Sequence, residues 1–253
     1  MKNFVEYIFL IGIILFTFSG CEKPKKNNDL KRLNLSGNVK SIIETKNRVT
    51  KPDDSLNRDL SKVIYIVHFN KQGFKTLESR EYVNNIINSK IKYNYPNDST
   101  VVQLMFDSQD SLQVKSIYTN NEKYDPICIE VFDSQDSLQA KGDYFYNSEG
   151  LLTNFLSYDH EGDQINKEKY SYDVHGNLIM KHIIENYGES FKYGYKNDSL
   201  GNMIELTIYK NDSLFSQKSS YSYEFDSQGN WIRRIEFVNG NEYEQKKRDI
   251  IYY

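Results

Sequence analysis

Along much of the chain, hydrophobic and polar residues alternate one by one. Residues 220–225 read Ser-Tyr-Ser-Tyr-Glu-Phe, and residues 191–196 read Phe-Lys-Tyr-Gly-Tyr-Lys. Successive side chains of a β-strand point to opposite faces of the sheet. The pattern therefore predicts strands with one apolar face and one wet face, as in antiparallel meanders.

A turn motif separates the predicted strands, and residues 170–178 (YSYDVHGNL) show it in full. Asp173 can accept a hydrogen bond from the backbone two residues later, and Gly176 can adopt the positive φ that the turn requires. The motif is an aromatic residue, then Asp or Asn, two further residues, and Gly or Asp. It recurs after Phe69, Phe106, Phe132, Tyr146, Tyr158, Tyr172 and Phe225.

The spacing of these turns predicts a repeat architecture. Residues 106–115 (FDSQDSLQVK) and 132–141 (FDSQDSLQAK) are almost the same peptide, offset by 26 residues. A full period near 26 and a half-period near 13 correspond to one strand plus one turn, within the range of repeat proteins.

We count about 15 or 16 strands and predict an all-β domain over residues 34–253. Sheets of more than about ten strands tend to curl, so we expect a single curved antiparallel meander with its aromatic face turned inward. Its first and last strands, residues 39–48 and 243–253, would be edges able to pair with another chain. The alternative is a 16-stranded outer-membrane barrel, which needs a continuous apolar outer band. Charged residues within many strands and a mean hydropathy of −0.69 argue against that alternative.

Residues 169–178 and 223–231 resemble the YD repeats of the Rhs family, whose units read roughly Arg-Tyr-x-Tyr-Asp-x-x-Gly-Arg/Asn-Leu. Lys169 stands in place of the Arg, and Phe225 in place of the second Tyr. The resemblance extends over roughly residues 62–240 and implies a strand–turn–strand architecture. Rhs proteins are large shells that enclose a toxin, and this chain is too short to enclose one.

Residues 1–20 have the features of a cleaved export signal: a positive start at Lys2, an apolar run over residues 8–18, and small residues before Cys21. The Ser-Gly-Cys ending is similar to the lipobox of bacterial lipoproteins of the Bacteroidetes type, although Phe18 stands where Leu is usual. This resemblance implies that Cys21 is acylated and anchors the chain to a lipid bilayer. Residues 21–33 then form a flexible tether. An uncleaved anchor or ordinary secretion is the alternative.

Composition excludes several function classes. The formal net charge is −3, and the basic residues show no pattern that would place them together on one face, so we expect no nucleic-acid partner. Cys128 is the only cysteine after Cys21, which excludes an intrachain disulfide in the mature chain and a cysteine-rich metal site. Its neighbours Ile127 and Ile129 indicate a buried, inert thiol.

The sequence shows no arrangement of residues that is typical of a catalytic or metal-binding site. None of the four histidines, His68, His160, His175 and His182, pairs with another at metal-ligand spacing. There is no serine elbow, phosphate-cradling loop or dinucleotide fingerprint. The Asp-Ser-Gln-Asp turns at 107–110 and 133–136 offer two carboxylates each, fewer oxygens than Ca²⁺ takes, so we interpret them as turn caps. We expect no enzyme activity, no cofactor and no metal.

Two patterns suggest sites on the domain. Asp-Ser-Leu recurs, and it resembles the Asp-Ser/Thr-apolar O-glycosylation site of exported Bacteroidetes proteins. We hypothesise modification at one or more of Ser55, Ser111, Ser137, Ser199 and Ser213; the alternative is that Asp-Ser ends a turn and Leu begins a strand. Tyrosine and tryptophan rings beside polar groups can also bind sugars, so Trp231, Tyr193 and Tyr223 are candidate ligand-binding residues unless they form the core.

Together these features predict a membrane-anchored lipoprotein of the cell envelope, attached to the outer membrane on its periplasmic or outer face. Its expected role is a binding or scaffolding module for a glycan or protein ligand. One alternative is an immunity or accessory partner of a toxin, suggested by the Rhs resemblance. The other is an enzyme acting on glycan or peptidoglycan, which would require two converging carboxylates, at least one with a perturbed pKa.

Overall fold

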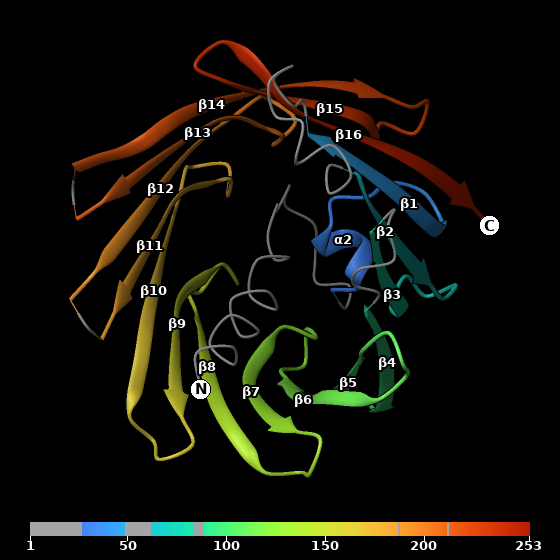
Figure 1. Cartoon of the computed structure of the whole chain (residues 1–253), viewed down its shortest axis with the longest axis vertical. Helices are drawn as coiled ribbons and strands as arrows, with labels where there is room; N and C mark the ends of the chain where they lie inside the picture. The colour runs from blue at the N-terminus through green and yellow to red at the C-terminus, as the bar shows by residue number, and fades with distance from the viewer. Residues whose placement is uncertain (1–26, 49–61, 83–88, 187, 212) are drawn as a thin grey trace.

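Each half-repeat of the sequence folds as one strand followed by one turn. The computed structural model describes residues 27–48, 62–82, 89–186, 188–211 and 213–253, which form a ring of strands around one short helix, α2 (Asp29–Arg32) (Figure 1). The strands are β1 (Val39–Arg48), β2 (Lys62–Phe69), β3 (Lys75–Tyr82), β4 (Ser89–Asn97), β5 (Thr100–Phe106), β6 (Leu112–Asn120), β7 (Pro126–Asp133), β8 (Leu138–Tyr146), β9 (Leu152–Asp159), β10 (Gln164–Tyr172), β11 (Leu178–Glu185), β12 (Ser190–Asn197), β13 (Met203–Lys210), β14 (Ser213–Phe225), β15 (Trp231–Val238) and β16 (Asn241–Tyr252).

The sheet closes on itself, which corrects the prediction of an open curved meander. β1 pairs antiparallel with β16, with Ile42 opposite Ile250 and Glu44 opposite Arg248, so all sixteen described strands form one barrel. The two segments expected as free edges, residues 39–48 and 243–253, therefore pair with each other. The twist and tilt of the strands carry the first and last strands together, and closure satisfies the backbone groups that an edge would leave unpaired.

The turn chemistry predicted from the sequence is confirmed at Asp173. Its Oδ1 atom accepts hydrogen bonds from the backbone N–H groups of His175 and Asn177, each at 2.9 Å, and Gly176 has φ +81°. At Asp110 and Asp136 an aspartate itself takes the positive φ, which this residue type tolerates better than most.

Because neighbouring strands are antiparallel, successive turns lie alternately at the two ends of the barrel. The turns at one end, called the α2 end below, are residues 70–73, 98–99, 121–125, 147–151, 173–177, 198–202 and 226–230. The described turns at the opposite end, called the far end, are residues 107–111, 133–137, 159–163, 185–186 with 188–189, 211 and 239–240. The helix belongs to the first end because Leu30 N donates to Gly73 O at 3.1 Å.

The helix lies inside the ring and thereby identifies the inner face of the sheet (Figure 1). Leu30 packs against Val39, Ile42 and Phe69 in one buried cluster. A second cluster on the inner face consists of Val114, Tyr118, Ile129, Val131 and Ala140. The strand register then assigns every other residue of each strand to the same inner wall.

Tyrosines on the inner wall link the two strands of several hairpins at their open ends, which lie at the α2 end. Tyr172 Oη donates to the carbonyl of Leu152 at 2.8 Å, beyond the last paired residues of β9 and β10. The same bond over the same 20-residue separation links Tyr95 to Lys75, Tyr146 to Pro126 and Tyr223 to Met203. The recurring tyrosine thus adds a side-chain hydrogen bond to a carbonyl at the start of the neighbouring strand.

Candidate binding site

The inner wall of β14, β15, β16 and β1 carries a group of charged and aromatic side chains, called the basic–aromatic cluster below. It consists of Glu44, Tyr221, Tyr223, Trp231, Arg234, Lys246 and Arg248. The register brings these residues together, because Glu44 lies opposite Arg248, Arg234 opposite Lys246, and Tyr223 opposite Arg234. Alternation within each strand aims these residues into the barrel. Trp231 is the exception: it lies beside a register shift at Phe225 and contacts Arg248, Arg234 and Tyr223 of the same cluster.

Glu44 is the ionic centre of the cluster. Its carboxylate lies 3.1 Å from Lys246 Nζ and accepts from Arg248 Nε at 2.9 Å, with 14% of the side chain exposed. Burial alone would raise the pKa of Glu44, but the charges of Lys246 and Arg248 lower it to about 2. The carboxylate is therefore ionised over the whole physiological range.

Trp231 supports the guanidinium of Arg248. That group lies 3.4 Å from the indole centroid, and Arg234 lies 5.6 Å from it. Tyr223 meets the same ring edge-on at 6.3 Å. Such cation–π contacts fix an arginine at little cost in hydration, so Trp231 holds a cation on one face rather than offering that face to a sugar.

Positive charge exceeds negative charge at the centre of this cluster. Within the cluster, Arg234, Lys246 and Arg248 face one carboxylate, that of Glu44. The neighbouring inner-wall carboxylates have other partners: Glu236 accepts from Tyr221, and Glu244 pairs with Lys46 at 2.6 Å. Among the described residues no carboxylate forms an ion pair with Arg234. Burial lowers the pKa of Lys246 and of Arg248, Glu44 opposes that shift, and the charge of Arg234 adds to it. An anion placed beside Arg234 would relieve this repulsion.

The two tyrosines of the cluster supply neutral hydroxyl groups. Burial raises the pKa of Tyr221 and of Tyr223, so both stay protonated. Tyr221 Oη donates to Glu236 at 3.2 Å, and Arg234 lies 5.2 Å from the Tyr221 ring.

The structure brings two of the three sequence-predicted ligand residues together. Trp231 and Tyr223 are in contact, whereas Tyr193 lies two strands away on β12, opposite Lys181 and Ile208. Sequence reasoning missed Glu44, Arg234, Lys246 and Arg248. Their alternation within β1, β15 and β16 was visible, but only closure of the barrel makes Glu44 a neighbour of Arg248.

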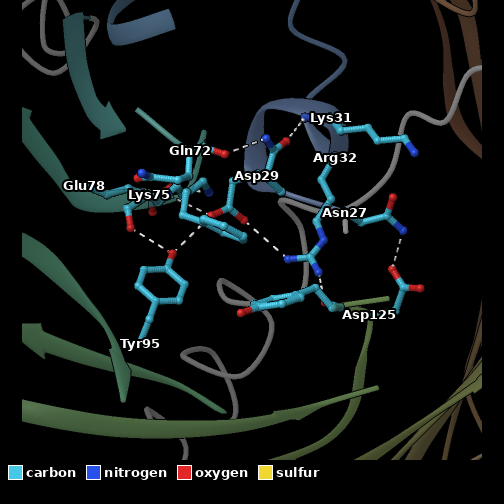
Figure 2. A network of polar contacts seen from close by, with 12 residues as sticks. Asn27, Asp29, Lys31, Arg32, Gln72, Lys75, Glu78, Tyr95 and Asp125 are labelled. Carbon is cyan, nitrogen blue, oxygen red and sulfur yellow. Dashed lines mark hydrogen bonds and ion pairs between the residues drawn. The ribbon is translucent and has the colours of Figure 1, made fainter. Parts of the chain in front are cut away.

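A second polar network docks the segment around α2 onto the barrel wall (Figure 2). Asp29 Oδ2 accepts from Lys75 N at 2.8 Å and from Tyr95 Oη at 3.2 Å. Arg32 contacts Asp29 Oδ1 at 3.4 Å and donates to the carbonyl of Tyr124. Asn28 caps the helix by accepting from Lys31 N at 3.0 Å.

The same network fixes the position of Asn27. Its Nδ2 atom donates to Asp125 Oδ1 at 2.8 Å, and its backbone N–H donates to the carbonyl of Lys123 at 2.9 Å (Figure 2). Residues 27–33, expected as the second half of the tether, therefore lie against the barrel.

The serines of the Asp-Ser-Leu motifs lie at strand starts and turns. Ser111, Ser137, Ser199 and Ser213 are exposed, and Ser55 lies outside the described residues. Ser111 N donates to Asp107 Oδ1 at 3.0 Å, and Ser137 N donates to Asp133 Oδ1 at 2.9 Å. Turn closure accounts for these two motifs, and glycosylation of the serines stays a prediction.

The remaining candidates from the sequence are a metal site, the thiol of Cys128 and the acylation site at Cys21. The described residues contain no group of three or more His, Cys, Asp or Glu that could hold a metal ion. Cys128 is only partly buried, and burial raises the pKa of its thiol. Cys21 lies outside the described residues. In the part of the chain that the structure describes, no helix is long and apolar enough to cross a membrane.

Comparison with known proteins defines the class of fold. No protein-family model matches the chain, and no curated protein matches its sequence. A porin-like protein from Bacteroides uniformis ATCC 8492 superposes with a TM-score of 0.61 and 14% identity over 85% of this chain and 99% of the other. The chain thus has the closed-barrel fold of that porin-like protein.

Two further solved structures align less well. A porin-like protein from Bacteroides vulgatus ATCC 8482 has 13% identity and a TM-score of 0.45 over 85% of this chain and 98% of the other. The TcdB2–TccC3–Cdc42 complex has 11% identity and a TM-score of 0.19 over 73% of this chain and 15% of the other. The TM-scores of these two alignments are too low to bear on the fold.

Proposed function

We propose that the protein is a lipid-anchored barrel of the bacterial envelope that binds an acidic saccharide on its inner wall. The export signal and the Ser-Gly-Cys motif support lipid attachment at Cys21. The fold shared with a porin-like protein of Bacteroides uniformis supports an envelope location.

The outer face of the barrel argues for a tether rather than insertion into lipid. By register, its outward positions include Lys115, Glu130, Lys141, Lys169, Lys218 and Lys247 well within their strands, and Lys196, Glu205, Glu224 and Arg233 nearer the strand ends. Lys196 and Lys218 both pair with Glu205 there, and their side chains are 66% and 57% exposed. A lysine or arginine facing lipid at mid-membrane costs about 2–4 kcal/mol. The ten charged residues on the outer face therefore favour a barrel whose outer wall contacts water rather than lipid.

The observation that carries the ligand assignment is the position of Arg234. Its guanidinium lies 5.2 Å from the Tyr221 ring and 5.6 Å from the Trp231 ring, and its charge acts on Lys246 and Arg248. No carboxylate of the described residues forms an ion pair with it. A sugar carboxylate matches the forked donors of a guanidinium. The tyrosine rings suit the apolar face of a sugar ring, and their hydroxyls suit its polar edge.

The carboxyl groups support binding without catalysis. Every carboxyl of the described part with a resolved pKa shift is shifted downward: Glu44, Asp110, Asp173, Glu205 and Asp226. Glycan hydrolysis requires a general acid whose pKa is raised. We therefore favour a binding protein over the glycan-active enzyme.

The test uses Trp231 as the reporter, because it is the only tryptophan of the chain. Its fluorescence is titrated with trigalacturonate, with uncharged galactotriose, and with sodium sulfate. Saturable binding of trigalacturonate alone is the expected result. Equal responses to the charged and uncharged sugars, or to sulfate, would contradict the assignment.

A matched pair of arginines locates the site. Arg234→Gln removes the inward guanidinium and should weaken binding at least about tenfold, the order expected for loss of one charged hydrogen-bonded contact. Arg233→Gln changes the next residue, which faces outward and pairs with Glu224 at 2.6 Å. It should leave the affinity unchanged; an equal loss in both variants would place the site elsewhere.

A further inference from the structure

The two ends of the barrel differ in the character of their turn tips. At the α2 end, Val174 is 95% exposed and Leu200 is 67% exposed. Both lie in neighbouring hairpins, because β11 pairs with β12. Exposed apolar side chains gathered at one end of a protein can mark a site of contact with a membrane or another protein. The described turn tips of the far end are polar: Ser108, Gln109, Ser134, Gln135, His160, Glu161, Asn186, Asn211 and Asn239.

The chain itself places the lipid anchor near the α2 end. Asn27 is held there by Asp125 and by the carbonyl of Lys123. Cys21 lies six residues earlier, and six extended residues span at most about 20 Å. If Cys21 is acylated, as the proposed function requires, its lipid lies within about 20 Å of this end of the barrel.

Charge alone does not distinguish the two ends, because both carry carboxylates. The far end has Asp107, Asp110, Asp133, Asp136, Asp159, Glu161, Asp163, Glu185 and Glu189. The α2 end has Asp29, Asp98, Glu122, Asp125, Glu149, Asp173, Asp198 and Asp226. It also has Lys31, Lys71 and Lys123, and Lys25 and Lys26 precede it in the sequence. The exposed aliphatic tips and the position of the anchor are what set the α2 end apart.

We infer that the barrel stands with its α2 end against the lipid bilayer, and that Val174 and Leu200 enter the headgroup region. The far end then projects into the aqueous phase. This inference rests on acylation of Cys21, and it adds the orientation that acylation alone does not determine. The bilayer here is a surface partner of the turn tips, and the wall of the barrel stays in water.

The test uses the mature lipidated chain in vesicles of phosphatidylcholine and phosphatidylglycerol. In a Cys128→Ser background, an environment-sensitive dye is attached to Val174→Cys, Leu200→Cys or Glu161→Cys. Glu161 is the matched control, since its side chain is 71% exposed in a far-end turn. Substitution at exposed turn tips leaves the fold intact, and two labelled positions at the α2 end check each other.

The emission of dyes at positions 174 and 200 should shift to the blue, and a nitroxide attached to the lipid should quench most of that emission. The dye at position 161 should respond to neither. If the protein sediments with the vesicles but positions 174 and 200 stay in water, the orientation is overturned while anchoring stands. If the protein does not sediment with them, the inference falls together with the acylation on which it rests.

Discussion

The guanidinium of Arg248 lies 3.4 Å from the centroid of the Trp231 ring, and its Nε atom donates to Glu44 at 2.9 Å. One side chain on β16 therefore connects an aromatic ring on β15 with a carboxylate on β1, across the seam that closes the barrel. For this reason we expect substitutions that disrupt the basic–aromatic cluster also to weaken the pairing of β1 with β16 that closes the barrel.

Glu44→Gln should destabilise the protein by about 3 kcal/mol, because it leaves Lys246 and Arg248 buried without their counter-ion. Chemical denaturation at neutral pH measures the loss. Glu224→Gln is the control, since Glu224 pairs with Arg233 on the outer face with its side chain 59% exposed. That change should stay within about 0.5 kcal/mol. Equal effects of the two substitutions would refute the role given to Glu44.

The same carboxylate predicts a pH dependence. The pKa of Glu44 is about 2 in the folded protein against an ordinary value of 4.5. The folded state therefore gains stability from Glu44 above pH 4.5 and loses that gain as the pH falls toward 2. Unfolding midpoints between pH 5 and pH 2.5 should fall more steeply for the native chain than for Glu44→Gln. Parallel curves would mean that Glu44 titrates normally.

Tyr172→Phe should cost about 1 kcal/mol, because it removes a hydrogen bond to the carbonyl of Leu152, a residue that is 1% exposed. Thermal or chemical unfolding provides the measurement. Tyr158→Phe is the matched control, as the Tyr158 hydroxyl has no hydrogen-bond partner among the described residues. The hairpin-linking role would be excluded if both substitutions had the same small effect.

Gly142→Ala should destabilise the barrel by about 1–3 kcal/mol, the usual range for overpacking. An added Cβ would lie 2.5 Å from the Phe155 ring and 2.9 Å from Ile129 Cγ2. Gly194→Ala is the comparison, because the nearest atoms to its Cβ are 3.9 Å away. It should be neutral or slightly stabilising. A neutral Gly142→Ala would show that the inner wall between β7 and β9 is loosely packed.

The sequence was informative where structure is local. The turn at Asp173 follows from side chains within four residues of each other, and the strand over residues 220–225 follows from alternation. The turn at residues 121–125 was missed because Tyr124, not Gly or Asp, takes the positive φ of +69°. The repeat period could still have located this turn, since Asn121 precedes Asn147 by one full period of 26 residues.

Closure and the basic–aromatic cluster were not predictable in this way. Glu44 and Arg248 are separated by 204 residues, and each alone is an ordinary charged residue in an alternating strand. Whether strands 39–48 and 243–253 end as edges or meet depends on the summed twist and tilt of the whole sheet. No local sequence pattern determines this total twist and tilt.

The central claim is that a barrel with the fold of a porin-like protein is held at the membrane by its N-terminus while its wall faces water. The most direct measurement is the sedimentation of the mature chain carrying Cys21→Ser, in buffer without detergent. A folded, monodisperse β-protein that unfolds cooperatively is the predicted result. A chain that aggregates until detergent is added would contradict the account and place the wall of the barrel in lipid.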